Sequence, residues 1–164
     1  MPRSDEAGAG ESLGQGIEYE RQFARAFLDP RRRGRFLELV KARDGSSRAT
    51  PKGRNRLRQY CSMLADLEHW LLDEVKQSAL YTSALETDEI RDRLVRLGSP
   101  EECQVLSISA SLDNQRLSLE EALSRLSDGD NESTMLICCP DSLAFYWHGE
   151  IAGVSAILRS GRAR

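Results

Sequence analysis

The chain has 164 residues and a formal net charge of −3, and 40% of its residues are hydrophobic while 30% are charged. A globular chain of this length buries roughly 70% of its unfolded surface, so one domain with a core of its own is expected. The apolar run near residues 133–142 is shorter than the roughly 20 apolar residues of a membrane-spanning helix. We therefore expect no transmembrane segment and no membrane partner.

The two ends of the chain set the expected domain limits. Residues 1–16 are rich in Gly, Ser and acidic side chains, and they offer little apolar surface to offset the entropy lost on ordering. They contain neither the apolar stretch of a signal peptide nor the arginines of a transit peptide, so a cytoplasmic protein is expected. The sequence predicts a disordered tail over 1–16, a single α+β domain over 17–159 and a frayed C-terminus over 160–164.

The first part of the domain, residues 17–97, is predicted to be helical. Apolar side chains at helical spacing predict one helix over residues 17–29 and a second over 33–43. A threonine followed by proline begins a third, over 50–71, in which apolar residues recur at steps of three and four. Residues 68–84 show no clean periodicity, which indicates an ordered loop or an irregular helix end.

Two later helices have clear end signals. Thr87, followed by two acidic residues, begins a helix that Gly98 and Pro100 close. Ser118 and Glu121 have the spacing of a capping box, in which each side chain accepts a hydrogen bond from the other residue's backbone N–H. A further helix is therefore predicted to begin at Ser118.

The strands are predicted in the sheet-containing part, residues 98–159. Alternating apolar residues indicate a strand over Cys103–Ser109 and another over 151–158. Between them, Thr134 to Trp147 is the most apolar stretch of the chain, and its central Pro140-Asp141-Ser142 favours a tight turn that pairs two strands in the middle of the sheet. The fold class is therefore α+β, with a helical N-terminal half packed with a small, mostly antiparallel sheet of three to four strands.

Charge is distributed unevenly along the chain. Residues 30–60 hold eleven Lys and Arg against two acids, a local charge of +9. Residues 61–164 hold nine basic residues against eighteen acids, a local −9, and residues 1–29 hold three against six, a local −3. The chain is thus divided into an early basic segment and a later acidic one.

The basic segment supplies the candidate binding residues. Cationic side chains on two helices and their loop attract phosphate backbones or an acidic protein surface. The acidic later segment offers an alternative, because it can neutralise the arginines within one molecule or across a homodimer, and solvated arginine faces are also common. Aromatic residues for base stacking are not interleaved with the arginines. The candidate residues for a protein partner or nucleic acid are Arg31, Arg32, Arg33, Arg35, Lys52, Arg54, Arg56 and Arg58.

Catalytic and metal-binding motifs are weak in this sequence. The four cysteines are unevenly spaced and the two histidines lie 79 positions apart, so we expect reduced, buried thiols and no metal or cofactor. A calcium loop beginning at Asp128 fails, because Ser133 stands where glycine is required. Carboxylates around the sheet leave a small hydrolase or nuclease as an alternative function, with the candidates Asp113, Glu120, Glu121, Asp141 and Glu150.

Part of the chain resembles a group of small uncharacterised bacterial soluble proteins. The resemblance covers about Thr87 to Leu158 and rests on Leu112-Asp113, on the run Leu117-Ser118-Leu119-Glu120-Glu121-Ala122-Leu123, and on Ser142-Leu143-Ala144-Phe145-Tyr146 with Gly149-Glu150. It implies a bacterial, cytoplasmic origin and carries no activity. Three functions are thus open: a non-enzymatic interaction or regulatory module that binds an acidic partner or itself, a nucleic-acid-associated protein, and a carboxylate-dependent hydrolase or nuclease.

Overall fold

The computed structural model describes residues 8–41, 69–82, 85–107, 111–112, 115–128, 134–147 and 155–161. Five helices and six strands lie within these ranges. Most of the helix predicted over 50–71 lies outside them. The candidate residues Lys52, Arg54, Arg56 and Arg58 lie outside them as well.

A six-stranded antiparallel sheet forms the middle of the fold, in the order β1-β6-β5-β4-β2-β3. The α+β class is confirmed, but the predicted number of three to four strands is wrong. The predicted strands correspond to β2, β4, β5 and β6, whereas β1 and β3 are edge strands too short to show an alternating pattern. The strands are β1 (Leu80–Tyr81), β2 (Glu102–Ser107), β3 (Arg116–Ser118), β4 (Thr134–Cys139), β5 (Leu143–Trp147) and β6 (Ser155–Arg159).

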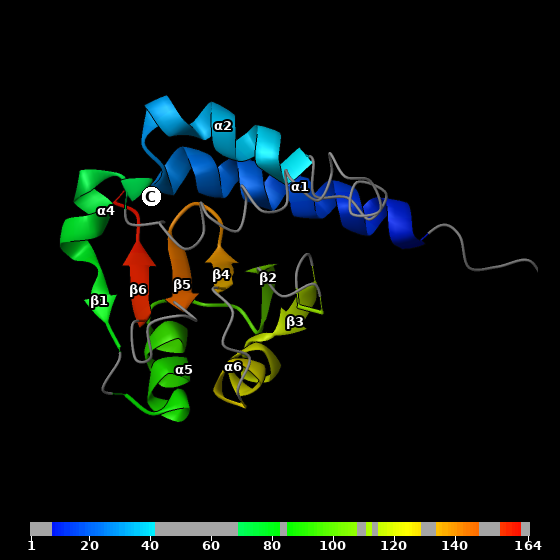
Figure 1. The fold of residues 1–164 in the computed structure, drawn as a ribbon. Coiled ribbons are helices and arrows are strands. Elements are labelled where there is room, and N and C mark those ends of the chain that lie inside the picture. The colour runs from blue at the N-terminus through cyan, green and yellow to red at the C-terminus, as the bar shows by residue number, and fades with distance from the viewer. Residues whose placement is uncertain are drawn as a thin grey trace, which may run out of the picture.

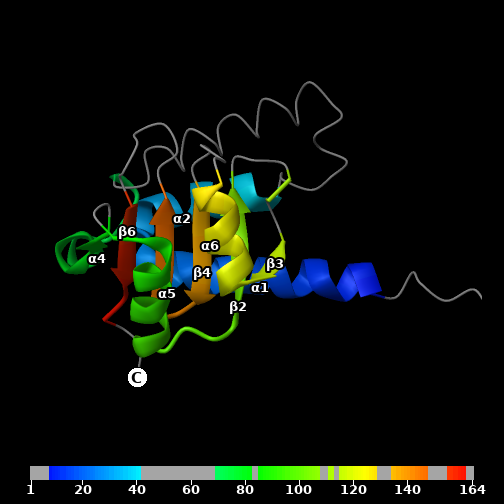
Figure 2. The same cartoon turned by 90° about the horizontal axis from the view of Figure 1, so that it is seen from below.

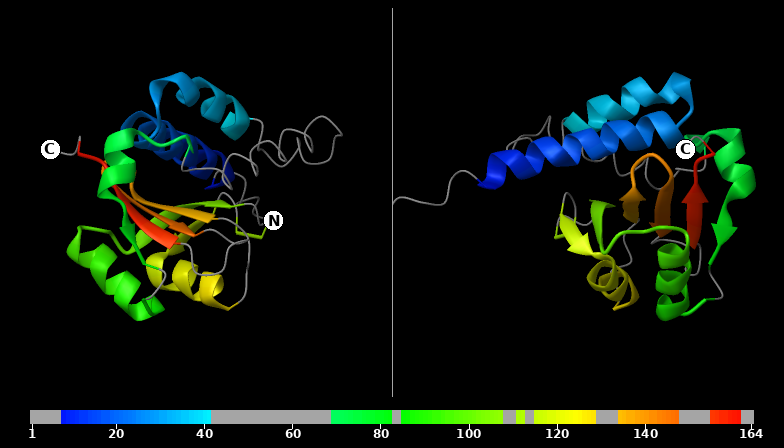
Figure 3. Two further views of the ribbon diagram at one scale, coloured as in Figure 1. Left: turned by 60° about the vertical axis from the view of Figure 1, so that its left-hand side comes forward. Right: turned by 180° about the vertical axis from the view of Figure 1, so that it is seen from behind.

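Helices cover both faces of this sheet, which gives three layers (Figures 1 and 3). The helices α1 (Gly8–Phe27) and α2 (Pro30–Lys41) lie on one face, and α5 (Thr87–Arg96) and α6 (Leu119–Ser127) lie on the other (Figure 2). The short α4 (Asp73–Ser78) packs beside β6 and leads into β1. The sheet therefore separates the basic helix α2 from the later helices α5 and α6.

The central strands carry an apolar core on each face. Met135 and Leu136 are neighbours in β4 but belong to different cores, the first under α1 and α2 and the second under α5 and α6. On the α1–α2 side, Phe23, Phe27 and Phe36 are completely buried, and the rings of Phe23 and Phe27 stack with centroids 4.8 Å apart. Burial on both faces explains why the central strands are apolar at successive positions.

The observed helix limits correct several predicted ones. The first helix begins at Gly8, so residues 8–16, which were predicted to belong to a disordered tail, are helical. Extending a helix costs little once its packed turns have formed, and here Phe23 and Phe27 supply those turns. The second helix begins at Pro30, because proline is well suited to the first helical position.

The ends of α5 and α6 follow the predicted signals with two differences. Gly98 closes α5 with φ of 101°, a conformation that glycine adopts without strain. Its N-terminal cap is Glu86 rather than Thr87, in a capping box with Glu89. At α6, Ser118 Oγ accepts the Glu121 N–H at 3.1 Å, while the Glu121 carboxylate pairs with Arg125.

The C-terminal boundary also differs from the prediction. Ser160, predicted to lie in a frayed end, is buried and donates through its Oγ to the carbonyl oxygen of Ala26 at 3.0 Å. Its backbone N–H donates to the carbonyl oxygen of Ser142 at the same distance. These bonds extend ordered structure past β6 and fasten it to α1. Among the described helices, none has the length and apolarity needed to cross a membrane.

Candidate partner-binding surface

The turn between α1 and α2 directs the first residues of α2. Asp29 caps the helix, because its Oδ1 accepts the Arg31 N–H at 2.8 Å and its carbonyl oxygen accepts the Arg32 N–H at 2.9 Å. Pro30 follows at the first helical position, where no N–H is needed. Phe36 then faces the core with no exposed surface. The buried side of α2 is therefore fixed, and most of its arginines face away from the core.

Three of the four α2 arginines within the candidate set are exposed. Arg31, Arg32 and Arg35 lie on the surface, and we call these three residues the arginine surface. Arg33 is half-buried, and its Nε donates to the carbonyl oxygen of Leu28 at 3.0 Å. Its Nη2 is buried without a hydrogen-bond acceptor among the described residues. Arg33 thus braces the α1–α2 turn, and we leave it out of the proposed surface.

Trp70 lies under the arginine surface although it is 38 positions away from Arg32 in sequence. The guanidinium carbon of Arg32 lies 5.4 Å from the centroid of the Trp70 ring. A backbone bridge between Leu28 and Leu71 brings the two segments together, and the Asp29 N–H donates to the Trp70 carbonyl oxygen at 2.9 Å. Stacking on tryptophan orients the planar guanidinium and leaves its N–H edge available for an anion.

The first turn of α2 concentrates positive charge. It contains no acidic residue, although the helix macrodipole favours anions at this end and disfavours cations. Arg35 pairs with Glu38 at 3.5 Å, but the two side chains are 52% and 72% exposed, so we expect the pair to contribute less than about 1 kcal/mol. The charges of Arg31 and Arg32 in the first turn therefore oppose, rather than support, the local stability of the helix.

The later acidic residues lie on the opposite side of the sheet. We call Asp88, Asp92, Glu101 and Glu120 the acidic face; all four are exposed, and they belong to α5, to the segment before β2 and to α6. Arg91 lies among them, with nitrogen–oxygen distances of 3.7 Å to Asp88, 3.4 Å to Asp92 and 4.0 Å to Glu120. None of the ion pairs between described residues joins α2 to α5 or α6.

The distance between the layers limits any attraction between the two charged faces of one molecule. Packed layers of secondary structure lie roughly 10 Å apart, so α2 and the α5–α6 layer are separated by about 20 Å or more. The Debye length at physiological ionic strength is about 8 Å. Within one molecule, the acidic face therefore does little to neutralise the arginine surface.

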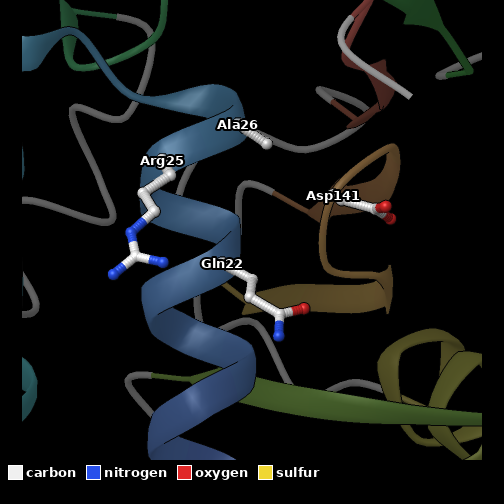
Figure 4. A pocket seen from close by; sticks show the side chains of 4 residues that line it. All are labelled: Gln22, Arg25, Ala26 and Asp141. Atoms are coloured by element: carbon white, nitrogen blue, oxygen red, sulfur yellow. The ribbon is translucent and has the colours of Figure 1, made fainter. Parts of the chain in front are cut away.

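The candidate catalytic carboxylates that the structure describes do not share a site. Glu120 lines a groove of about 490 Å³ between α5 and α6. Asp141 lines a separate hollow of about 330 Å³ with Gln22, Arg25 and Ala26. In this hollow the Arg25 guanidinium points away from the Asp141 carboxylate (Figure 4). Asp113 and Glu150 lie outside the described residues. Glu120 and Asp141 therefore line different hollows, and the carboxylate of the third described candidate, Glu121, pairs with Arg125 at 2.8 Å.

The thiols of the described cysteines are poorly suited to nucleophilic chemistry. Cys103, Cys138 and Cys139 are free, and the first two are buried, as the sequence predicted. Burial is the main cause that raises the pKa of Cys138 to about 12, and it raises the pKa of Cys103 further and that of Cys139 in the same direction. At neutral pH these thiols are therefore protonated.

This burial predicts the reactivity of the thiols. In a Cys61→Ser variant at pH 8, a disulfide-exchange reagent should modify Cys103 and Cys138 only after the protein unfolds. A pKa of about 12 in place of 9.0 lowers the thiolate fraction of Cys138 by about 10³-fold. The folded pKa exceeds the unfolded one, so the free energy of unfolding should fall as the pH rises from about 9 towards 12. Rapid modification of the folded protein, identified by mass spectrometry, contradicts this assignment.

The described residues offer no metal centre. No group of three His, Cys, Asp or Glu side chains among them has the geometry to hold an ion. His69 is exposed, and His148 lies outside the described ranges.

The sequence identified the residues of the arginine surface but not the contacts that surround them. The run of arginines identified Arg31, Arg32 and Arg35, whereas the inward direction of Arg33 depends on the turn after Leu28. Trp70 gave no sequence signal, because the bridge that places it joins segments far apart in the chain. No family model, no curated protein and no solved structure matches this chain.

Proposed function

We propose that the protein is a non-catalytic binding module that holds an acidic protein partner on the arginine surface. One observation carries this proposal: α2 lies on the opposite face of the sheet from α5 and α6, so the acidic face does not neutralise the arginine surface within one molecule. Guanidinium groups bind carboxylates through paired hydrogen bonds, and Arg32 is already oriented for this by Trp70.

The cost of the arrangement to folding supports the same function. Cations in the first turn of a helix lower its stability, typically by about 0.3–1 kcal/mol each. Residues that are unfavourable for folding are expected where binding requires them. A carboxylate-rich partner would offset the unfavourable positive charge at the start of α2. The relief of this unfavourable interaction would add to the affinity of binding.

Nucleic acid is the second candidate, because the structure brings an aromatic ring to the arginines. The position of Trp70 argues for the protein partner instead. Arg32 lies over its ring, and the ring also packs against the core under α1 and α2, so stacking a base on it requires displacement of the guanidinium. Phosphate contacts would remain, but without a stacking platform among the described residues.

The setting proposed for this function is a bacterial cytoplasm, with no membrane partner. The bacterial part rests on the resemblance of residues 87–158. The three cysteines in the described part of the chain are free, which supports a reducing compartment.

Fluorescence anisotropy with a labelled short polyglutamate peptide tests the proposal at low ionic strength. The wild type should bind, and the R31E/R35E variant should bind at least about tenfold more weakly, a change of about 1.4 kcal/mol. The R93E/R96E variant is the matched control, because it changes the net charge equally on the opposite side of the sheet and should bind like the wild type.

Three results would count against the protein-partner function. Absence of polyglutamate binding by the wild type removes its basis. An equal loss in both variants indicates a general effect of net charge. Tighter binding of a single-stranded oligonucleotide of equal charge, with the salt dependence of counterion release, favours nucleic acid instead.

A further inference from the structure

The groove between α5 and α6 has the chemistry that complements the arginine surface. Its lining combines the apolar side chains of Val95 and Leu119 with the carboxylates of Glu101 and Glu120, and it includes one cation, Arg91, which lies 4.0 Å from Glu120. Val95 is 54% exposed and contributes apolar surface to the groove. Arginine suits such a lining, because its methylene stem packs on apolar surface while its guanidinium binds a carboxylate.

The charges of the two faces are opposite and similar in size. The four carboxylates of the acidic face and Arg91 among them have a balance of −3, although α5 itself is neutral, because Arg93 and Arg96 are also exposed on it. The arginine surface contributes three positive charges, of which Arg35 is shared with Glu38. Both faces are exposed, and both belong to the same chain.

One molecule cannot join its own two faces, because α2 and the α5–α6 groove lie on opposite sides of the sheet (Figure 2). Two molecules can join them without any change of fold. A contact between different surfaces of identical chains is heterologous, so it leaves one free surface of each kind and can repeat.

We propose that the acidic partner is a second copy of this chain, whose α5–α6 groove receives the arginine surface. This inference rests on the proposed function, and it names the partner. The association is electrostatic at its rim, so it weakens as salt shortens the Debye length from about 30 Å at 0.01 M to about 3 Å at 1 M. The apolar lining of the groove contributes binding free energy from buried apolar surface, which salt does not screen.

Complementary variants test this assembly by sedimentation velocity at low ionic strength. The R31E/R35E variant has no working arginine surface, and the E101K/E120K variant has no working groove. Each variant alone should be a monomer, while the wild type forms larger species as its concentration rises. An equal mixture of the neutral variants R31Q/R35Q and E101Q/E120Q should stop at a dimer, because only one pair of charged surfaces remains and the two neutral surfaces do not attract each other.

The neutral R31Q/R35Q variant and circular dichroism check that lost association is not lost folding. The neutral variant should remain folded and should associate at least about tenfold more weakly than the wild type. A wild type that stays monomeric at every concentration overturns the self-association, and so does a charge-reversed variant, R31E/R35E or E101K/E120K, that associates alone as strongly as the wild type. If the monomeric wild type nevertheless binds polyglutamate, the proposed function stands and only the identity of the partner is wrong.

Discussion

Replacement of Phe23 by alanine should lower the free energy of unfolding by about 3–5 kcal/mol, the usual cost of removing a fully buried aromatic ring. Phe23 has no exposed surface, stacks on Phe27 and lies 6.1 Å from Phe36, measured between ring centroids. Phe23 of α1 therefore packs near Phe36 of α2, and both belong to an apolar core that also includes residues of the sheet. Urea denaturation followed by circular dichroism measures the change.

The exposed aromatic Tyr81 provides the matched control for this variant. Its side chain is 66% exposed on the edge strand β1, so Tyr81→Ala should change the free energy of unfolding by no more than about 0.5 kcal/mol. Similar small effects of the two substitutions contradict the packing of α1 and α2 on the sheet. Because α2 carries the arginine surface, loosening this packing should also weaken polyglutamate binding.

Replacement of Phe145 by alanine should cost a similar amount, about 3–5 kcal/mol, from the opposite core. Phe145 is completely buried in the central strand β5 and belongs to the cluster under α5 and α6. Phe145 lies in the core on the opposite side of the sheet from α2, so its loss should lower the free energy of unfolding without changing the arginine surface. The folded fraction of this variant should therefore retain wild-type affinity for polyglutamate. Denaturation and anisotropy on the same sample measure both quantities.

Two results would contradict a fold with one apolar core on each face of the sheet. If Phe145→Ala costs less than about 1 kcal/mol, α5 and α6 do not pack on the sheet as the structure places them. If it abolishes peptide binding while the protein remains folded, the binding surface is not confined to the α2 side.

Local sequence patterns predicted the elements more successfully than their arrangement. The stretch from Thr134 to Trp147 indicated the two central strands, because burial on both faces requires a continuous apolar run. The same reasoning missed β1 and β3, whose few residues are held by pairing with β6 and β2 rather than by their own pattern. Periodicity shows which side of an element is apolar, but not which face of a sheet it covers.

For the candidate site as well, the sequence predicted the local features but not their arrangement. The arginine run was visible in the sequence, and so was the acidic later half. Their separation by the sheet depends on the crossing of α1 and α2 over one face, which no local pattern encodes. The contact between Arg32 and Trp70 likewise depends on the bridge between Leu28 and Leu71.

The free energy of unfolding of the Arg31→Glu variant tests most directly whether the charge of α2 is left available by the fold. Arg31 is exposed at the start of α2, and no described residue forms an ion pair with its guanidinium. A carboxylate placed there interacts favourably with the helix macrodipole, so the variant should be as stable as the wild type or more stable by about 0.3–1 kcal/mol. A loss of more than about 1 kcal/mol would show that the chain's own carboxylates already hold this arginine.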